Sequence, residues 1–403
     1  MTSDSKICFI TNAYPDYEGH YRGNFVKNLA LSLMEKNFSI FIVTPRVYKN
    51  KKINKKPSSG EKIYRFPYLS GNKLLIEYEK IPYFRMVTYF ISGFFSCIYA
   101  IKKEKSVLIH AHWVIPTGLL AVLVNLFFRL PVIIHVRGSD IHTFGRKNSF
   151  LSFLSRFTLK KAVLIVTPSQ KLKKLLMENF RVPQDKIKVI INGIDTKRFS
   201  PGDSPEESKE KLGLPVNKRI ILFVGGIVKI KGLDYMVSAA QKIVKTHKDL
   251  LFVLVGKGEY QNKLYDDIEK KGLIPFFLLA GEKSTGEIPL WLNAAHIFLL
   301  PSLNEGMPNS VLEALSCKVP VVASNVGDIP LYVKNGINGF LVSPENSEDI
   351  ADKLALLLDD ENVYNKIKGN SSLITHDFDS KTKSKEIAEI YRKLIKEQLR
   401  VRN

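Results

Sequence analysis

Residues 296–324 read HIFLLPSLNEGMPNSVLEALSCKVPVVAS and contain a complete strand, loop, helix and strand pattern. The stretch begins and ends with short apolar runs, at 296–302 and 319–324, of the kind found in buried parallel strands. Between them a Gly and a Pro interrupt the chain, and apolar residues then recur with helical spacing. This is the repeating unit of doubly wound sheets, so the stretch predicts an α/β fold.

The same alternation continues in both directions and falls into two series. The first series of predicted strands covers residues 6–11, 39–45, 107–112, 132–137, 162–168 and 186–191. The second series covers residues 219–225, 250–256, 276–281, 296–302, 319–324 and 339–344. A segment rich in Gly, Pro, Asp and Ser at 192–205 separates them. We therefore predict two doubly wound Rossmann-like domains, at 1–195 and 196–375, followed by a helix at 376–403 that could pack on either domain, with the N-terminal one preferred.

The composition favours an anionic partner. The chain has 403 residues and a formal net charge of +21, which suits nucleic acid, an anionic membrane or a phosphorylated substrate. No zinc-finger, RNA-recognition or basic-zipper pattern is present, so we predict that nucleic acid is not a partner. The three cysteines lack metal-ligand spacing and no signal peptide precedes the first predicted strand, which predicts a cytoplasmic protein.

Two long apolar stretches bear on membrane contact. Residues 86–101 and 114–128 are both shorter than the roughly 20 residues that span a bilayer. The favoured interpretation is a buried or half-buried helix, and the alternative is a helix lying in the interface of the inner leaflet, where flanking cations meet anionic lipid. The lysine-rich segment 48–62 is predicted to be a solvated loop or, second, a membrane-facing one. We expect a cytoplasmic protein that makes peripheral contact with the anionic inner face of the cell membrane.

Two carboxylates, Glu305 and Glu313, lie in the stretch that opened the analysis. Glu305 falls in the loop after the strand and Glu313 falls inside the helix. A carboxylate has two acceptor oxygens that match the vicinal hydroxyls of a ribose, which is one interpretation of Glu313. Glu305 would then meet another hydroxylated group. We predict that the pair contacts two ends of one elongated ligand.

The start of this helix is a predicted phosphate site. Pro308 suits the first helical position, because its missing N–H needs no acceptor there. The free amides of a helix start and the positive end of its dipole favour a phosphate. The predicted donors include the amides of Met307, Asn309 and Ser310.

A second strand-to-helix junction occurs at 223–237, FVGGIVKIKGLDYMV. Its glycine pair, Gly225 and Gly226, allows close backbone approach to a ligand. Lys231 follows and could neutralise a diphosphate as a point charge.

The first domain contributes a less specific set of polar residues. Gly19 and Gly23 follow the first strand where a helix begins, and they could serve as a phosphate loop or as a plain turn. His112, Arg137 and Asp140 follow two neighbouring strands and are predicted to face a ligand. The spacing of the histidines does not predict a zinc site.

These motifs together resemble retaining glycosyltransferases of family four, which have the GT-B fold of two Rossmann-like domains facing a central cleft. Glu305 and Glu313 are similar to the Glu-x7-Glu element of that family. Residues 191–199, INGIDTKRF, look like its Asn-Gly-hydrophobic-Asp loop, which adds Asn192 to the candidate acceptor or phosphate residues. Residues 335–344 resemble its closing strand. The resemblance covers nearly the whole chain.

The resemblance implies transfer of a sugar from a UDP- or GDP-sugar donor to a lipid-linked or glycan acceptor. The second domain would hold the donor, which is a co-substrate, and the first domain the acceptor. Glu313 would bind the ribose, Glu305 the donor sugar, and the amides from Gly306 to Asn309 the sugar and phosphate. Lys231 would stabilise the departing diphosphate, so no cofactor or metal is expected. The one Asp-x-Asp pattern, at 377–379, lies in a linker and is not assigned a magnesium ion.

Two positions depart from the family pattern. Gly226 stands where many relatives have Arg, so the diphosphate would depend on Lys231 and secondarily on Lys229. Arg137 stands where many have His, and an Arg cannot accept a proton. Arg137 would then stabilise charge or bind an anionic acceptor, with His112 or His135 compensating. These departures leave two alternatives to the transferase, a non-catalytic subunit that binds nucleotide-sugars and a sugar-nucleotide epimerase.

Overall fold

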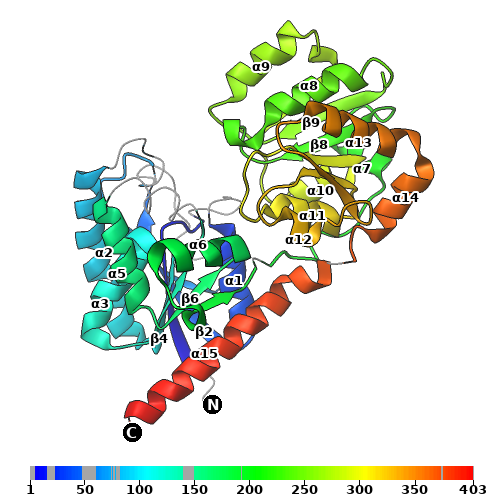
Figure 1. The fold of residues 1–403 in the computed structure, drawn as a ribbon. Helices are drawn as coiled ribbons and strands as arrows, with labels where there is room; N and C mark the ends of the chain where they lie inside the picture. Colours follow the sequence, from blue (N-terminus) through cyan, green and yellow to red (C-terminus); the bar gives the residue numbers. More distant parts are fainter. Residues whose placement is uncertain are drawn as a thin grey trace. The chain divides into compact units, whose positions relative to one another are not determined.

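The computed structural model describes residues 5–15, 23–47, 60–73, 75, 78, 82–138, 149–191, 193–373 and 375–402. The chain divides into an N-terminal unit, residues 1–192 with 380–403, and a C-terminal unit, residues 193–379. Each unit is a parallel sheet covered by helices (Figure 1), which confirms the predicted pair of doubly wound α/β domains. The predicted boundaries after residues 195 and 375 lie three and four residues from the observed divisions after 192 and 379.

The N-terminal sheet has seven strands in the order β3-β2-β1-β4-β5-β6-β7, and all neighbours are parallel. Its strands are β1 (Ser5–Thr11), β2 (Phe38–Arg46), β3 (Lys62–Pro67), β4 (Leu108–His112), β5 (Val132–His135), β6 (Leu164–Thr167) and β7 (Ile187–Val189). The helices of this unit are α1 (Asn24–Met34), α2 (Tyr83–Glu104), α3 (Leu119–Phe128), α5 (Ser149–Lys161), α6 (Gln170–Phe180) and α15 (Ser380–Arg402). Strands β1 and β4 are neighbours inside the sheet. Strands β2 and β3 follow on the β1 side, and β5, β6 and β7 follow on the β4 side.

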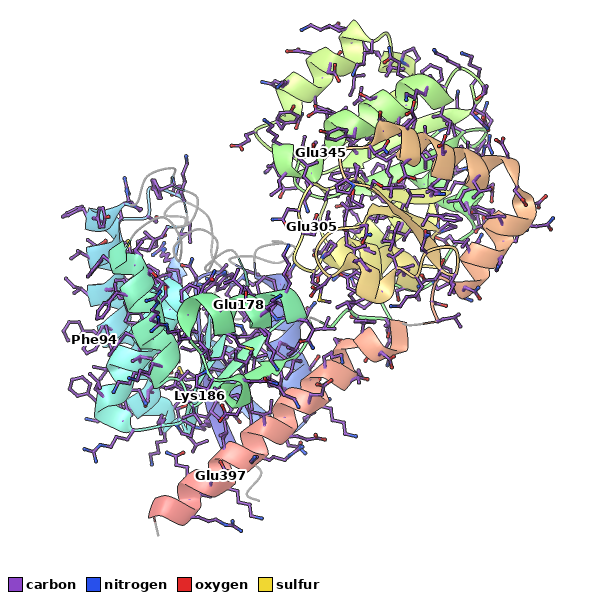
Figure 2. The ribbon with its side chains drawn as sticks, viewed as in Figure 1. Phe94, Glu178, Lys186, Glu305, Glu345 and Glu397 are labelled. Carbon is purple, nitrogen blue, oxygen red and sulfur yellow. The ribbon has the colours of Figure 1, made fainter. Side chains whose placement is uncertain are left out.

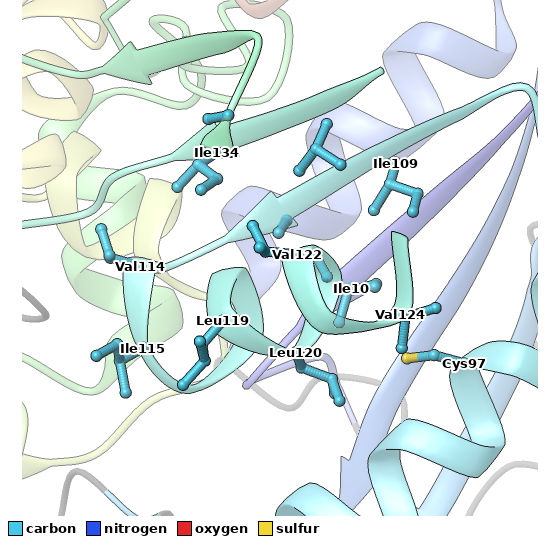
Figure 3. Packing of buried hydrophobic residues seen from close by; sticks show 14 of the residues in the cluster. Ile10, Cys97, Ile109, Val114, Ile115, Leu119, Leu120, Val122, Val124 and Ile134 are labelled. Carbon is cyan, nitrogen blue, oxygen red and sulfur yellow. The ribbon is translucent and has the colours of Figure 1, made fainter. Parts of the chain in front are cut away.

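Alternating side chains of the central strands build two cores in the N-terminal unit. In β1, Cys8 and Ile10 join a cluster with α2 and α3, whereas Ile7 and Phe9 join a second cluster on the other face with α1 and α15. Figure 3 shows the first cluster, with Ile109 and Ile134 of the sheet opposite Leu120 and neighbouring residues of the chain before and within α3. Continuous apolar strands are required by this arrangement, since both faces are buried.

Helix α15 belongs to the N-terminal unit although it follows the C-terminal unit in sequence (Figure 1). Its residues Ile387, Ala388 and Tyr391 are buried in the second cluster. The Tyr391 ring packs edge-on against Phe38, and its hydroxyl forms a hydrogen bond with Nδ1 of His110. The end of the chain therefore closes one face of the first sheet.

The C-terminal sheet has six parallel strands in the order β10-β9-β8-β11-β12-β13. Its strands are β8 (Arg219–Val224), β9 (Leu250–Val255), β10 (Phe277–Gly281), β11 (Ile297–Leu300), β12 (Val321–Ser324) and β13 (Gly339–Val342). Its helices are α7 (Pro205–Leu212), α8 (Leu233–Ile243), α9 (Gln261–Lys270), α10 (Ile288–Asn293), α11 (Asn309–Ser316), α12 (Ile329–Tyr332), α13 (Ser347–Asp359) and α14 (Glu361–Asn370). The direction of winding reverses between β8 and β11, which makes that point the expected ligand site of such a sheet.

Strand β3 was not predicted from the sequence. Its residues, KIYRFP, are mostly half-buried and include two cations, so the segment lacks the apolar run that marks the other strands. It pairs only with β2 and forms one edge of its sheet. An edge strand needs apolar residues mainly on its inner face, which weakens the sequence signal.

Helix α2 contains the apolar stretch at 86–101, for which the sequence left a buried helix and a helix at the membrane interface as alternatives. By length and composition it is the one helix in the described part of the chain that could cross a membrane, yet a third of its apolar window is buried in the protein. Tyr89 and Cys97 are fully buried against the sheet, as expected for a core helix. It is 22 residues long and extends beyond the apolar stretch at both ends.

Replacing Tyr391 with Ala should selectively destabilise the N-terminal unit. The side chain is fully buried, so its loss should cost about 3–5 kcal/mol. Urea unfolding can be followed separately in the two units through Trp113 and Trp291, in variants that keep one of the two tryptophans. We expect the Trp113 transition to move to lower urea while the Trp291 transition stays in place.

The matched control is Tyr265→Ala, which removes an exposed tyrosine of α9 and should shift neither transition. An unchanged Trp113 transition in Tyr391→Ala would show that α15 does not stabilise the first sheet.

Candidate active site

The two strand-to-helix loops that flank the reversal point of the C-terminal sheet carry Lys231 and Glu305. Strand β8 ends at Val224, and Lys231 closes a short 3-10 turn, Lys229–Lys231, just before α8. Strand β11 ends at Leu300, and Glu305 lies in the loop before α11. Because β8 and β11 are parallel neighbours, both loops leave the same edge of the sheet.

Lys231 and Glu305 form an ion pair across these loops. The Lys231 Nζ lies 2.6 Å from Oε1 of Glu305, and the two side chains are only 21% and 10% exposed. The hydroxyl of Ser302 donates a second hydrogen bond, also 2.6 Å, to the same oxygen. Oε1 of Glu305 therefore accepts two hydrogen bonds, and none of the described side chains donates one to Oε2. The second oxygen is the one that can accept a hydrogen bond from a ligand hydroxyl. Figure 2 labels Glu305 within its unit.

The backbone holds the two loops against each other. The amide of Leu303 donates to the carbonyl of Ile230, at 2.9 Å. Gly232 has a φ of 63°, and a Cβ at this position would lie 2.1 Å from the carbonyl oxygen of Pro301. Only glycine combines this left-handed conformation with so close an approach. The positions of Lys231 and Glu305 are therefore determined by main-chain packing as well as by their ion pair.

Helix α11 begins one residue later than predicted. Pro308 is the N-cap with extended backbone (φ −75°, ψ 110°), and Asn309 is the first helical residue. The amides of Asn309 and Ser310 are still at a helix start, where N–H groups have no acceptor within the helix. Gly306 is exposed, and a Cβ there would meet nothing within 4 Å, while Met307 is half-buried. The backbone at Gly306, next to Glu305, is therefore accessible to a ligand.

Glu313 lies one turn into α11 in an apolar setting. The residue is half-buried, and the described residues give its carboxylate no hydrogen-bond partner. Burial raises the pKa of Glu313 to about 7, and the nearby charge of Arg198 lowers it in opposition. A carboxylate held without partners is costly in the unliganded protein. Such a group is a candidate for binding a ligand that supplies the missing donors.

The two glycines after β8 differ in how much free space surrounds their backbone. The amide of Gly225 donates to the carbonyl of Val255, at 3.0 Å, so its backbone is committed to the sheet. Gly226 is exposed, and the nearest atom to an added Cβ is 3.9 Å away, on Lys257. Gly226 therefore leaves space where an Arg side chain could begin.

In the N-terminal unit, three histidines form a stack beneath Arg137. His110 and His112 lie on the same face of β4, and the register pairs His112 with His135 of β5. The ring centroids of the three pairs are 4.5, 5.4 and 5.4 Å apart, with the rings within 25° of parallel. The stack lies on the face that α15 covers, since Tyr391 bonds to His110.

The three histidines are neutral, and the positive charge beside them belongs to Arg137. Burial and then the charge of Arg137 lower the pKa of His110 to about 3. Burial, with His110 and Arg137, holds the pKa of His112 well below its ordinary value, and burial and Arg137 do the same for His135. Arg137 donates to Nδ1 of His112 at 2.8 Å, so the His112 proton must reside on Nε2. The guanidinium also lies 4.5 Å from the centre of the Phe25 ring.

The structure places His112, a predicted catalytic residue, in the interior rather than at the surface. Its side chain is fully buried and its Nδ1 accepts from Arg137, so His112 can position Arg137 but cannot itself touch a substrate. Gly23 is the N-cap of α1, and a Cβ there would meet the carbonyl oxygen of Ala13 at 2.2 Å. Its close approach is thus to the protein's own backbone. Gly19, Asp140 and Asn192 lie outside the described residues.

The three histidines do not fit a metal ion, although their ligand atoms lie within 4.8 Å of one another. Nδ1 of His112 already accepts a hydrogen bond from Arg137, so its lone pair is not available to a metal ion. The positive charge of Arg137 beside His112 also opposes a cation.

Sequence reasoning missed several residues of these sites. The sequence analysis does not predict Ser302 as a site residue, although it lies at a strand end three residues before Glu305. Arg198, whose charge reaches Glu313, lies in the 191–199 loop that the sequence analysis singled out for Asn192, but the sequence does not show that this loop approaches Glu313. His110 could have been grouped with His112 by strand alternation.

The comparisons with known proteins assign the family. Residues 204–373 match the model of glycosyl transferases group 1, and residues 23–198 match that of glycosyltransferase family 4. The UDP-Gal:alpha-D-GlcNAc-diphosphoundecaprenol alpha-1,3-galactosyltransferase of Escherichia coli is 31% identical over 298 residues, covering 72% of this chain and 76% of the relative. This chain therefore belongs to the family 4 glycosyltransferases and is a glycosyltransferase, as the motifs predicted.

Other similar proteins agree with this assignment. A D-inositol 3-phosphate glycosyltransferase of Corynebacterium aurimucosum is 30% identical over 207 residues, 49% of each chain. The structure of Anabaena HepE with UDP superposes with a TM-score of 0.78 at 18% identity, over 96% of this chain and 100% of HepE. WaaG, a glycosyltransferase involved in lipopolysaccharide biosynthesis, gives a TM-score of 0.70 at 14% identity over 96% and 99%. These structures establish the GT-B fold.

Replacing Glu313 with Gln should stabilise the C-terminal unit at high pH. The folded protein holds the Glu313 proton up to a pKa of about 7, above its ordinary value of 4.5. The contribution of this group to stability therefore falls as the pH rises from 4.5 to 7. Above pH 7, Glu313→Gln should unfold roughly a few degrees higher than the wild type, and below pH 4.5 the difference should vanish.

Thermal unfolding followed through Trp291 makes this measurement, with Glu269→Gln, an exposed glutamine substitution on α9, as the control. A destabilised Glu313→Gln variant above pH 7 would contradict the account of Glu313 as an unpartnered carboxylate.

Proposed function

We propose that this chain is a retaining glycosyltransferase that moves a hexose or N-acetylhexosamine from a UDP- or GDP-sugar to a lipid-linked or glycan acceptor. The observation that carries the proposal is the Lys231–Glu305 ion pair at the reversal point of the C-terminal sheet. A nucleotide diphosphate needs a cation and free N–H donors at such a point, and a sugar needs hydroxyl acceptors. Lys231, the start of α11 and Glu305 supply all three.

The donor is oriented by three groups of the C-terminal unit. The ribose hydroxyls donate to Glu313, the diphosphate meets the amides at the start of α11, and the sugar hydroxyls donate to Oε2 of Glu305. Ligand binding would give Glu313 the donors that the protein lacks and would draw its proton off. Glu305 and Glu313 are eight residues apart on a loop and a helix, so they contact opposite ends of the donor rather than one group.

In the transfer step, the bond between the sugar C1 and the diphosphate oxygen breaks as C1 bonds to an acceptor oxygen. The acceptor attacks from the side that the diphosphate leaves, which retains the configuration at C1. The acceptor proton passes to the departing diphosphate. Negative charge grows on that leaving group, and Lys231 stabilises it in a site with little water. This arrangement requires no metal, because the cation is part of the protein.

The acceptor contacts the N-terminal unit through Arg137. The guanidinium is held by His112 and Phe25, and it keeps its charge at all relevant pH values. An acceptor carrying phosphate or diphosphate suits such a group. The Escherichia coli relative, by its name, uses a diphosphoundecaprenol-linked acceptor, which supports a lipid-linked acceptor for this chain.

A lipid-linked acceptor would place the protein in the cytoplasm at the inner face of the membrane, in the synthesis of a cell-surface glycan. The corynebacterial relative is named for a phosphorylated inositol acceptor, which offers a water-soluble alternative with the same anionic character. The net charge of +21 agrees with either acceptor.

A donor and acceptor panel tests the proposed activity. UDP-, GDP- and ADP-sugars are incubated with the protein and with polyprenyl-diphosphate-linked sugar or inositol phosphate, and released nucleotide and product are measured. We expect one nucleotide class to give acceptor-dependent release, and the product's anomeric configuration by NMR to match that of the donor. An inverted product would refute retention. Nucleotide binding without turnover would favour a non-catalytic subunit, and conversion to an epimeric sugar would favour an epimerase.

Replacing Lys231 with Met should slow transfer more than it weakens donor binding. Loss of one charge-stabilising group costs about 10²–10³ in kcat, and the donor keeps its contacts with Glu313 and the start of α11. Steady-state kinetics with the active donor give kcat and KM separately. The control is Lys245→Met, an exposed lysine after α8 that should leave both unchanged. An equal effect of the two substitutions would remove Lys231 from the mechanism.

Replacing Glu313 with Ala should abolish recognition of the ribose. The wild type is expected to bind UDP or GDP about tenfold or more tightly than the 2′-deoxy nucleotide, because the carboxylate accepts from the 2′-hydroxyl. Glu313→Ala should bind the two nucleotides nearly equally, as measured by calorimetry, because no acceptor remains for the 2′-hydroxyl. A variant that keeps the full preference would show that another residue contacts the ribose.

A further inference from the structure

Helix α2 is apolar on the side that faces away from the sheet. Five residues at helical spacing form this outer stripe, and their exposed fractions range from 53% to 72%. They are Phe84, Val87, Ile91, Phe95 and Tyr99. The opposite side of the helix is buried against the sheet at Tyr89, Cys97 and Ala100. An ordinary surface helix would place polar residues where the outer stripe lies.

The stripe continues onto the two neighbouring helices. Helices α2, α3 and α5 stand beside one another on one face of the N-terminal sheet (Figure 1). Helix α3 exposes Leu126 and Phe127, at 64% and 68%, and α5 exposes Phe150 and Phe153, at 59% and 64%. We call the exposed apolar residues of these three helices the aromatic face. Phe94, on the outer flank of α2 in Figure 2, contacts both Phe95 and Phe127 and joins the first two helices.

Positive charge gathers at one end of the aromatic face. The strands that follow α2, α3 and α5 are parallel, so the three helices run in the same direction and their C-terminal ends meet at one edge. At these ends lie the exposed cations Lys102, Lys103, Lys105, Arg129, Lys160 and Lys161. The sequences of the three helices contain a single carboxylate, Glu104, which is buried and paired with Lys62. No carboxylate of these helices therefore offsets the exposed cations.

The occupant of this face must be apolar and anionic at once. A second copy of the chain would present the same cations, and like charges would oppose that contact. A helix that spans a membrane is excluded by topology, because α2 connects β3 and β4 of one sheet and buries a third of its apolar window in the protein. Aromatic side chains beside lysines are the pattern of helices that lie in the headgroup region of an anionic bilayer.

We propose that the aromatic face is a membrane-docking surface, which inserts its Phe and Tyr side chains into an anionic bilayer while the lysines at its edge contact lipid headgroups. The inference deepens the proposed function, because it names the surface through which an enzyme acting on a lipid-linked acceptor would reach its substrate. Binding to lipid can be measured without turnover, so the two can fail independently.

The test is sedimentation of the full chain with vesicles. We expect binding to phosphatidylcholine vesicles that contain phosphatidylglycerol, and weak binding to phosphatidylcholine alone. Phe84→Ser with Phe95→Ser should lower the affinity for the mixed vesicles at least about tenfold, because two inserted rings return to water. The matched control is Tyr265→Ser with Leu356→Ser, which removes two exposed apolar side chains of the C-terminal unit and should change nothing.

The charge contribution is tested in the same way. Lys102→Gln with Lys103→Gln should lower affinity for the mixed vesicles by about fivefold per lysine, and the effect should fade at high salt. Lys245→Gln with Lys366→Gln removes the same net charge from the C-terminal unit and should have little effect.

Three outcomes would overturn the proposal: no binding to mixed vesicles, equal loss in the test and control pairs, or a wild-type dimer that Phe84→Ser with Phe95→Ser converts to a monomer in analytical ultracentrifugation. Transfer to a water-soluble acceptor analogue should be unchanged in the Phe84→Ser, Phe95→Ser variant. That readout separates a failed docking surface from a failed transferase.

Discussion

The ion pair between Lys231 and Glu305 is the interaction on which the rest of the site depends. It joins the loops after β8 and β11, the two neighbouring strands between which the winding direction reverses, and its atoms lie 2.6 Å apart. A charged pair with so little exposure is stable only where hydrogen bonds and backbone hold its geometry. Ser302, the Leu303 amide and the close approach at Gly232 provide those restraints. The same contacts that stabilise the pair therefore place a cation and a carboxylate ready for a ligand.

The two units differ in how burial affects the pKa values of their polar side chains. In the C-terminal unit, the described residues give Glu313 no hydrogen-bond partner, and burial raises its pKa to about 7, so the ionised group costs stability. The N-terminal unit keeps three histidines neutral and places one permanent cation, Arg137, above them. A guanidinium held by His112 and by the Phe25 ring has few alternative positions. The first arrangement suits reversible binding of hydroxyls, and the second suits binding of a fixed negative charge.

The fold was predictable from sequence where both faces of a strand are buried. Twelve of the strands were found from the sequence, and most of them, such as β1 and β8, contain a buried apolar run. The half-buried edge strand β3 was not found. The covered side of α2 could not be identified from the sequence, because its buried side, at Tyr89 and Cys97, and its exposed side, at Phe95, both carry apolar residues. The structure shows that one side meets the sheet and the other is exposed.

The site was predictable where its residues are close in sequence. Glu305, Glu313 and Lys231 lie in loops and helix starts after strands, and local patterns mark such positions. The contacts that define their chemistry come from distant residues, as with Arg198 near Glu313, or from strand register, as with His112 and His135. His112 is fully buried and contacts Arg137, and no pattern in a single sequence shows that a histidine at a strand end is buried in this way.

The most direct test of the account is a crystal structure of the protein with its nucleotide-sugar donor. The account predicts that the diphosphate lies at the start of α11 with an oxygen within about 3 Å of Lys231 Nζ, the sugar at Glu305 and the ribose hydroxyls at Glu313. A donor bound at any other edge of the C-terminal sheet, or with its ribose away from Glu313, would contradict it.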